Sequence, residues 1–155
     1  MKIYIILFVL SISFISGYSQ NNEDLKLIKR SIVLFQNDFN DGLFTNAEKY
    51  TTEDWEHINP GGGITIGRNA VLKEVLSVHQ AFLKGVSMSI SSINIKIITF
   101  NVAIVDVVHK ISLYELPKGI KHKNEHQRKT YIVVKMKGEW LIKHDQNTVI
   151  QNVMN

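Results

Sequence analysis

The sequence contains no cysteine, which excludes a disulfide framework, a zinc ribbon, an iron–sulfur cluster and a cysteine nucleophile. Only two prolines and nine glycines occur in 155 residues, which excludes collagen-like and low-complexity chains. The net charge of +4 is a mild basic excess, and the basic residues have few aromatic neighbours, so nucleic acid is not an expected partner. What remains is a chain that is 45% hydrophobic, enough for one ordinary globular domain.

Several catalytic and cofactor motifs are also missing. Neither the G-x-S-x-G elbow of a serine hydrolase nor the G-x-G-x-x-G fingerprint of a dinucleotide site occurs. The glycines at 61–63 lack the Lys-Ser/Thr pair of a phosphate loop, so we interpret them as a turn. His122 and His126 have the spacing of a two-histidine metal site on a helix, but their lysine-rich surroundings are typical of a solvated loop. The sequence therefore predicts no cofactor and no metal.

The N-terminus has the pattern of a secretory signal peptide. Lys2 precedes an apolar run over 3–15, and small residues follow it. The run is about 13 residues long, shorter than the roughly 20 that span a bilayer, although an uncleaved membrane anchor is the alternative. We predict that residues 1–19 are removed and that residues 20–155 form a single domain. This domain would be exported from a bacterial cell to the periplasm or the medium, without stable membrane association after cleavage.

Two segments have the period of an amphipathic helix. Apolar residues recur at spacings of three and four from Leu25 to Phe39, and a second apolar stripe runs from Val71 to Leu83. Residues 46–52 predict a further short helix.

The remaining segments alternate with a period of two. Strands are expected, in chain order, over residues 55–59, 64–66, 86–97, 102–113, 128–136 and 139–149. The apolar phase changes near Ser91-Ser92, which predicts a bulge. Residues 102–113 are apolar on both parities in their middle, which predicts a central strand covered on both faces.

Helices therefore precede most of the strands along the chain. This order predicts an α+β fold, a cone-shaped single domain in which N-terminal helices pack on a strongly bent antiparallel sheet. Because helices cover only one face of such a sheet, we expect a homodimer in which a second copy buries the outer face. Tyr131 and Val133 are the expected contributors to that interface.

Several short motifs carry a resemblance to a known family. They read YTTEDW at 50–55, NPGG at 59–62 with IGR at 66–68, RKTYIVVK at 128–135, and GEWLI at 138–142 with QNT at 146–148. The chain from Asn22 to Ile150 resembles the nuclear transport factor 2-like superfamily, also described as SnoaL-like or ketosteroid-isomerase-like. The closer likeness is to the SgcJ/EcaC-type branch of small bacterial proteins.

The resemblance implies a cone fold with an internal pocket. Members of the superfamily include isomerases, dehydratases, cyclases, hydrolases and plain binding modules, so the likeness selects no single reaction. Its isomerases use a carboxylate in an apolar cone to move a proton next to a carbonyl.

The last strand becomes polar on its expected core face. Trp140 and Ile142 share a parity with His144 and Gln146. Burying an unpartnered imidazole or amide costs about 1–3 kcal/mol. His144 and Gln146 therefore either line a wet pocket or find buried partners.

The first strand changes in the same way. Trp55, His57 and Asn59 share a parity that suits the mouth of a cone or, alternatively, an exposed rim. In the central strand, Asp106 shares its parity with aliphatic residues. Such a carboxylate either pairs with a cation, here Arg128 or Lys110, or has its pKa raised by desolvation.

These patterns lead to three hypotheses. We expect an exported protein that binds a small apolar or amphipathic molecule in a pocket lined by Trp55, His57, Asn59, Asp106, Trp140, His144 and Gln146. The first alternative is an isomerase-, dehydratase- or cyclase-like enzyme that transfers protons in the same pocket, with His144, His57 or Asp106 as acid or base. The second alternative is a non-catalytic, dimeric interaction module.

Overall fold

The computed structural model describes the backbone of residues 2–151 and the side chains of residues 21–151. The predicted signal peptide, residues 1–19, lies outside the residues whose side chains are described. Among the described residues, no helix combines the length and the apolar character needed to cross a membrane.

The elements follow the order expected for an α+β fold. They are α1 (Lys2–Asp41), the 3₁₀ turn η1 (Ala47–Lys49), β1 (Thr51–Ile58), β2 (Ile64–Ile66), α2 (Arg68–Gln80), β3 (Met88–Thr99), β4 (Val102–Ile111), β5 (Tyr114–Glu115), β6 (Lys121–His122), β7 (Glu125–Met136) and β8 (Glu139–Val149). The main sheet has the strand order β2-β1-β8-β7-β4-β3, and β5 pairs with β6 in a separate arm. Because β1 and β8 run parallel, the curled sheet is mixed and not fully antiparallel as predicted.

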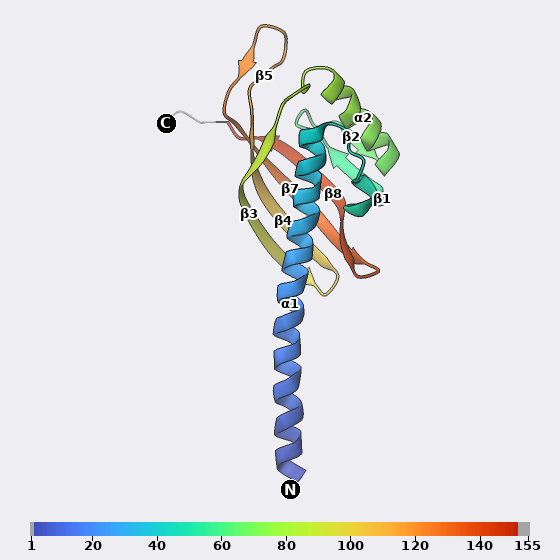
Figure 1. Ribbon diagram of the computed structural model, residues 1–155, viewed down its shortest axis with the longest axis vertical. Helices are drawn as coiled ribbons and strands as arrows, with labels where there is room; N and C mark the ends of the chain where they lie inside the picture. Colours follow the sequence, from blue (N-terminus) through green and yellow to red (C-terminus); the bar gives the residue numbers. More distant parts are fainter. Residues whose placement is uncertain (1, 152–155) are drawn as a thin grey trace.

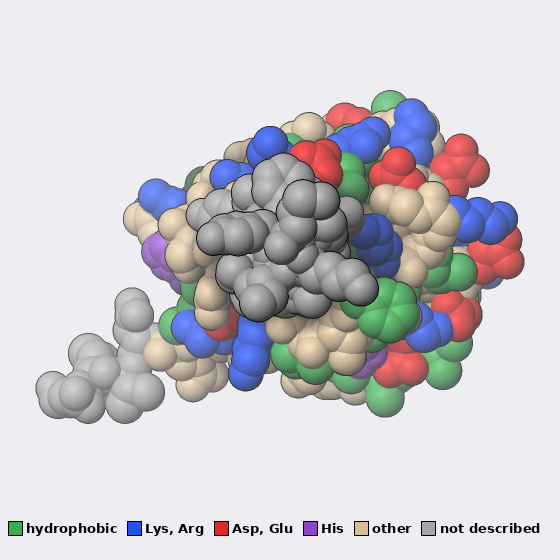
Figure 2. Space-filling model, turned by 90° about the horizontal axis from the view of Figure 1, so that it is seen from below, with side chains coloured by type: hydrophobic (Ala, Val, Ile, Leu, Met, Phe, Trp, Pro, Cys, Tyr) green, Lys and Arg blue, Asp and Glu red, His purple; other side chains and the backbone are tan. Residues whose placement is uncertain are grey.

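The helices lie against one side of this sheet (Figure 1). The three- and four-residue spacing in α1 turns Ile28, Ile32 and Phe35 toward the sheet, where each is at most 3% exposed. They join Trp55 of β1 and Ile142 of β8 in one hydrophobic core. On the face seen in Figure 2, Lys and Arg side chains are intermixed with Asp and Glu side chains, so neither sign dominates that surface.

One register shift in the sheet was predicted from the sequence, and another, in β8, was not. The pairing of β3 with β4 shifts between Ile90 and Ser92, which confirms the predicted bulge. In β8, Ile142 pairs with Val133 but His144 pairs with Ile132, so Lys143 is an extra residue. Beyond this bulge the opposite parity of β8 faces the core.

The outer face of the sheet is more open than the sequence predicted. β4 buries Ala103, Val105 and Val107, whereas Ile104 on its other face is 39% exposed. Tyr131 and Val133 are completely buried in the core, so their assignment to an outer interface was wrong. These two residues of β7 share the parity that faces the helices, and Ile132 between them faces outward.

Candidate functional site

A cavity of about 610 Å³ opens between the two helices, the inner face of the sheet and the β5–β6 arm. Its two walls differ in chemistry. The apolar wall includes Phe35, Phe39, Phe44, Val75, Val78 and Phe82. The polar wall, from β1, β7 and β8 and the segment that follows β1, includes His57, Asn59, Gln127, Lys129 and Asn147. A molecule that fills the cavity would therefore meet hydrocarbon on one side and hydrogen-bonding groups on the other.

Asp145 lies behind the polar wall and contacts the side chains of Trp55, His57 and Lys129. It is completely buried and accepts hydrogen bonds from Trp55 Nε1 at 2.6 Å and from His57 Nδ1 at 2.7 Å. Lys129 Nζ forms an ion pair with the same carboxylate at 2.9 Å. Burial opposes the ionisation of Asp145, but the charge of Lys129 and the hydrogen bond from His57 outweigh it and lower the pKa to about 2. The carboxylate is thus ionised at any physiological pH.

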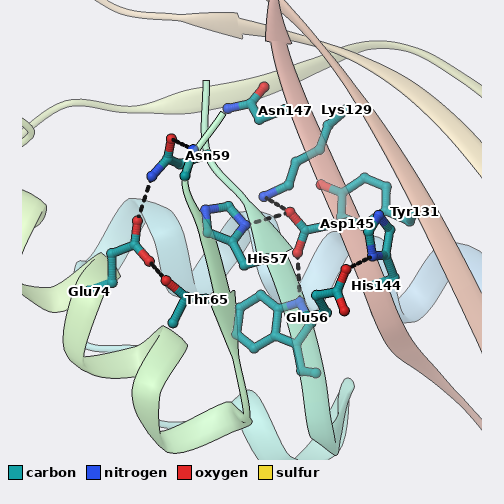
Figure 3. A network of polar contacts seen from close by, with 12 residues as sticks. Glu56, His57, Asn59, Thr65, Glu74, Lys129, Tyr131, His144, Asp145 and Asn147 are labelled. Atoms are coloured by element: carbon teal, nitrogen blue, oxygen red, sulfur yellow. Dashed lines mark hydrogen bonds and ion pairs between the residues drawn. The ribbon is translucent and has the colours of Figure 1, made fainter. Parts of the chain in front are cut away.

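Asp145 also fixes the tautomer of His57 (Figure 3). A carboxylate can only accept hydrogen bonds, so Nδ1 of His57 must carry the proton that it shares with Asp145. In the neutral ring, Nε2 then presents a lone pair. Among the described residues, none forms a hydrogen bond with Nε2, and His57 lines the cavity. The arrangement can accept a proton or a hydrogen bond from a bound molecule.

Lys129 reaches the cavity across aromatic rings. Its ammonium lies 4.2 Å from the ring centroid of Phe35 and 5.5 Å from that of Tyr131. Behind it, Tyr131 Oη lies 3.0 Å from Nε2 of the buried His109. Burial and the charge of Lys129 lower the pKa of His109 to about 3, so this histidine is neutral at physiological pH. His109 therefore serves the packing behind the site.

Asn59 forms the corner of the cavity next to the glycine turn. Its Oδ1 accepts hydrogen bonds from the backbone N–H groups of Gly61 and Gly63, both at 3.0 Å. A Cβ on Gly63 would lie 2.7 Å from Asn59 Nδ2, so a larger residue at this position would displace the Asn59 amide. Asn59 Nδ2 also donates to Glu74 at 3.0 Å, and Thr65 Oγ1 donates to the same carboxylate. Burial opposes the ionisation of Glu74, but these two hydrogen bonds lower its pKa.

The first-strand residues singled out from the sequence meet at this site. His57 and Asn59 line the cavity, and Trp55 lies beneath them, fully buried, with its indole on Asp145. The period of two in β1 places all three on one face, and the structure shows that it is the inner face, not the exposed rim that the sequence left open.

His144 and Gln146 do not line the cavity, so this part of the prediction was wrong. His144 Nδ1 lies 3.0 Å from Glu56 Oε1 outside the cavity lining, and Gln146 is exposed. The extra residue Lys143 reverses the parity of β8, so Asp145 and Asn147 face inward in their place.

Asp106 and Trp140 lie away from the cavity as well. Asp106 pairs with Arg128 at 3.2 Å on the outer face, which is the structural alternative that the sequence left open. Trp140 is buried in the core, but its indole donates to Asp24 at 2.9 Å and does not reach the cavity lining. Its side chain faces inward, but Trp140 lies near the start of β8, away from the end of the strand that lines the cavity.

Sequence reasoning missed Lys129 and Asp145. Lys129 shares its parity with the core residues Tyr131 and Val133, and that alternation is a signal that could have placed it inside. For Asp145 the sequence carries no local signal, because its orientation depends on the bulge.

No family model matches the chain, and no curated protein sequence does either. Solved structures are similar to it. An uncharacterized protein with a cystatin-like fold from Caulobacter vibrioides has 20% identity and a TM-score of 0.78, covering 84% of this chain and 92% of that one. A nuclear transport factor 2-like protein with a cystatin-like fold from Novosphingobium aromaticivorans has 14% identity and a TM-score of 0.72, covering 89% of both chains.

The chain has the nuclear transport factor 2-like fold. A third similar structure, a ketosteroid isomerase-like protein from Erwinia carotovora atroseptica, has 17% identity and a TM-score of 0.70, covering 84% of this chain and 98% of that one. The nuclear transport factor 2-like fold confirms the cone architecture expected from the sequence. At these identities the similarity establishes the fold alone, and the activity has to be inferred from the residues of the site.

Proposed function

We propose that the protein binds a small amphipathic molecule in the cavity, with the polar group of the ligand at His57. The volume of about 610 Å³ lies within the roughly 300–1,000 Å³ of typical small-molecule sites. The phenylalanine-rich wall suits an apolar body, and the polar wall suits one end of it. The observation that carries the proposal is the His57 ring, which Asp145 holds from behind while Nε2 remains available to the cavity.

Two tryptophan substitutions in consecutive positions of α2 test this proposal. Val78 lines the cavity, whereas Ser77 next to it is exposed. Val78→Trp should fill the cavity and abolish binding of the uncharged dye Nile red, followed by its fluorescence. Ser77→Trp is the matched control and should bind the dye like the unsubstituted protein. Equal dye binding by both variants would contradict a ligand site in this cavity.

The His57–Asp145 pair favours a second candidate function, an enzyme that moves protons. A buried carboxylate that orients a histidine and stabilises its protonated form is a common general-base arrangement. Nε2 would take a proton from the carbon next to a carbonyl, the C–H electron pair would form an enolate, and the imidazolium would return the proton to another position. The similar ketosteroid isomerase-like structure is consistent with such use of the fold.

This second candidate is tested by proton exchange. The probe is 2-tetralone in deuterated water, with exchange of its α-protons followed by NMR. A catalysed component that disappears in His57→Ala and persists in His144→Ala, whose imidazole lies outside the cavity, supports catalysis. Exchange of the α-protons at the rate seen in buffer alone would contradict proton-transfer catalysis and would not affect the proposed binding function.

We also propose a homodimer through the outer face of the sheet. Ile104 and Ile132 are register partners on β4 and β7 and are 39% and 36% exposed. Two adjacent aliphatic side chains on the outer face of the sheet suit a second copy of the same face. Ile132→Lys should convert the dimer to a monomer in light scattering, and a monomeric unsubstituted protein would exclude this assembly.

Export remains a prediction of the sequence alone. N-terminal sequencing of protein from the periplasm or the medium should find Gln20 as the first residue. A secreted chain that still begins with Met1 would refute cleavage.

A further inference from the structure

The β5–β6 arm forms one edge of the cavity and has few backbone contacts of its own. Its residues Tyr114, Leu116 and His122 line the cavity. The arm projects at the end of the molecule opposite the N-terminus (Figure 1), its two strands share only two register pairs, and every residue over 115–121 is exposed. A two-stranded hairpin is marginally stable by itself in water. Side-chain contacts therefore decide whether the arm stays against the cavity.

His122 makes the contacts that connect the arm to the main sheet. Its Nδ1 lies 3.0 Å from Oε2 of Glu125 at the start of β7, and its Nε2 lies 2.8 Å from the backbone oxygen of Leu116 in the loop between β5 and β6. The ring stacks on that of Tyr114, with the centroids 4.5 Å apart and the planes at 5°. One imidazole thus joins β5, the loop of the arm and β7.

Both oxygens that face the His122 ring are hydrogen-bond acceptors. Tyr114 Oη and Gln127 Nε2 also donate to Glu125, at 2.9 Å and 2.6 Å, as expected for an ionised carboxylate. A carboxylate and a backbone carbonyl only accept, so both contacts of His122 exist together only when both ring nitrogens carry a proton. The arrangement therefore requires the imidazolium form, with its positive charge next to Glu125.

Loss of one proton from His122 removes one of the two contacts. The nitrogen without a proton then directs a lone pair at an oxygen about 3 Å away, which is repulsive. A charge-assisted hydrogen bond is the stronger of the two, so the remaining proton stays on the nitrogen that faces Glu125. The contact that is lost is the one to Leu116, whose side chain forms part of the cavity lining.

Several titratable or charged groups surround the His122 ring: Tyr114 of β5, Lys121, Lys123, and Glu125 and His126 of β7. Burial and the hydrogen bond to Glu125 raise the pKa of Tyr114, so this phenol stays neutral. Histidine is the side chain whose charge ordinarily changes between pH 5 and 8. His126 shares a second, polar hollow with His122 but does not line the main cavity, which makes it a suitable control.

His79 also places both ring nitrogens near acceptors, but it does not contact the arm through them. Its Nδ1 lies 2.9 Å from the backbone oxygen of Val75, and its Nε2 lies 3.1 Å from that of Phe39. These carbonyls belong to α2 and α1. Because His79 and His57 also line the cavity, an effect of pH on binding is assigned to His122 only by a variant at that position.

We propose that His122 is a pH-dependent switch that closes the cavity: the imidazolium holds the Leu116 loop to Glu125, and loss of one proton releases the loop and opens this edge. A bound molecule would then be held more tightly at mildly acidic pH than at alkaline pH. The effect on binding rests on the proposed function, whereas the release of the arm does not.

The binding experiment compares the Kd of the uncharged dye Nile red at pH 5.5 and pH 8.5. His122→Phe keeps an aromatic ring against Tyr114 and removes both N–H donors. The ratio of the Kd at pH 8.5 to that at pH 5.5 should be at least about threefold larger in the unsubstituted protein than in His122→Phe. His126→Phe is the matched control and should keep the ratio of the unsubstituted protein.

Hydrogen exchange of the arm tests the release without any ligand. The amide of Leu116 donates to the Ile120 oxygen at 3.0 Å, and the amide of Ile120 donates to the Pro117 oxygen at 2.9 Å. Their protection, measured by NMR and corrected for the intrinsic exchange rate at each pH, should fall at least about threefold from pH 5.5 to pH 8.5. In His122→Phe the protection should be low at both values.

The outcomes separate this inference from the proposed function. Arm protection that depends on pH equally in the unsubstituted protein and in His122→Phe, or not at all, overturns the switch. Nile red binding that is lost in Val78→Trp still supports the cavity as a ligand site in that case. If Nile red binding survives in Val78→Trp while arm protection depends on His122, the proposed function fails and the switch of the arm stands.

Discussion

Two buried aspartates in this molecule have nearly the same partners and different surroundings. Asp145 accepts from the indole of Trp55 and pairs with Lys129, and Asp24 accepts from the indole of Trp140 and pairs with Lys135 at 2.6 Å. The first cluster borders the cavity through His57 and Lys129. The second joins α1 to β7 and β8, and none of its three residues lines the cavity.

A tryptophan, an aspartate and a lysine therefore do not by themselves make a functional site. In both clusters they satisfy one another and fix the packing of neighbouring elements. The clusters differ in depth, since the side chains of Asp145 and Lys129 are 0% and 6% exposed, against 9% and 22% for Asp24 and Lys135. The functional character at Asp145 comes from the cavity and from His57, which Asp145 orients.

The largest expected difference concerns the two carboxylates. Asp145→Asn leaves the buried Lys129 without a counter-charge and should lower the free energy of unfolding by about 3–5 kcal/mol. Asp24→Asn should cost about 1–3 kcal/mol, because water reaches Lys135 and reduces the penalty. Denaturant titration of both variants measures the difference, and equal losses would mean that depth does not distinguish the clusters.

Acid titration of the lysine variants sharpens the same contrast. The pKa of Asp145 is about 2 in the folded protein and 3.8 ordinarily, so its contribution to stability is present above pH 4 and is lost between pH 4 and 2. That loss is about 2 kcal/mol. Lys129→Met removes the charge that lowers this pKa, so its stability deficit relative to the unsubstituted protein should narrow as the pH falls through this range. A deficit of Lys129→Met that stays constant through this range would contradict the assignment.

The pH dependence of unfolding at higher pH tests the burial of His109, which packs behind the site. His109 has a pKa of about 3 in the folded protein and 6.5 ordinarily, so protons bind first to the unfolded chain below pH 6.5. The protein should therefore lose about 2 kcal/mol of stability through His109 between pH 7 and 5. His109→Phe should reduce the pH dependence of unfolding by this amount. Identical pH profiles for the two proteins would show that His109 is not held neutral by burial.

The smallest effect is expected for a substitution of His144, the residue immediately before Asp145 in the chain. His144 is partly exposed outside the cavity, and its one partner among the described residues is Glu56, which is also partly exposed. His144→Ala should cost less than about 1 kcal/mol and leave Nile red binding unchanged. A loss of dye binding in this variant would place His144 in the site after all and reverse the orientation of β8 described above.

The elements of this fold could be predicted from local patterns. The apolar spacing of α1 and α2 predicts both helices, and the change of phase at Ser91-Ser92 predicts the bulge in β3. The alternation of Trp55, His57 and Asn59 predicts that they share one face of β1, and the structure shows that this face is the inner one. Each of these signals lies within a few residues of the feature that it predicts.

The sequence by itself determined the α+β order, the helical faces, the strands of the main sheet and the shared face of Trp55, His57 and Asn59, because these follow from periodicity along one segment. Only the tertiary structure decided that Asp145 and Asn147 face the cavity while His144 and Gln146 face outward. That choice depends on Lys143, whose place as an extra residue is set by how β8 pairs with β7. A one-residue change in register reverses every side chain beyond it, and the sequence of a single strand does not contain the register of its neighbour.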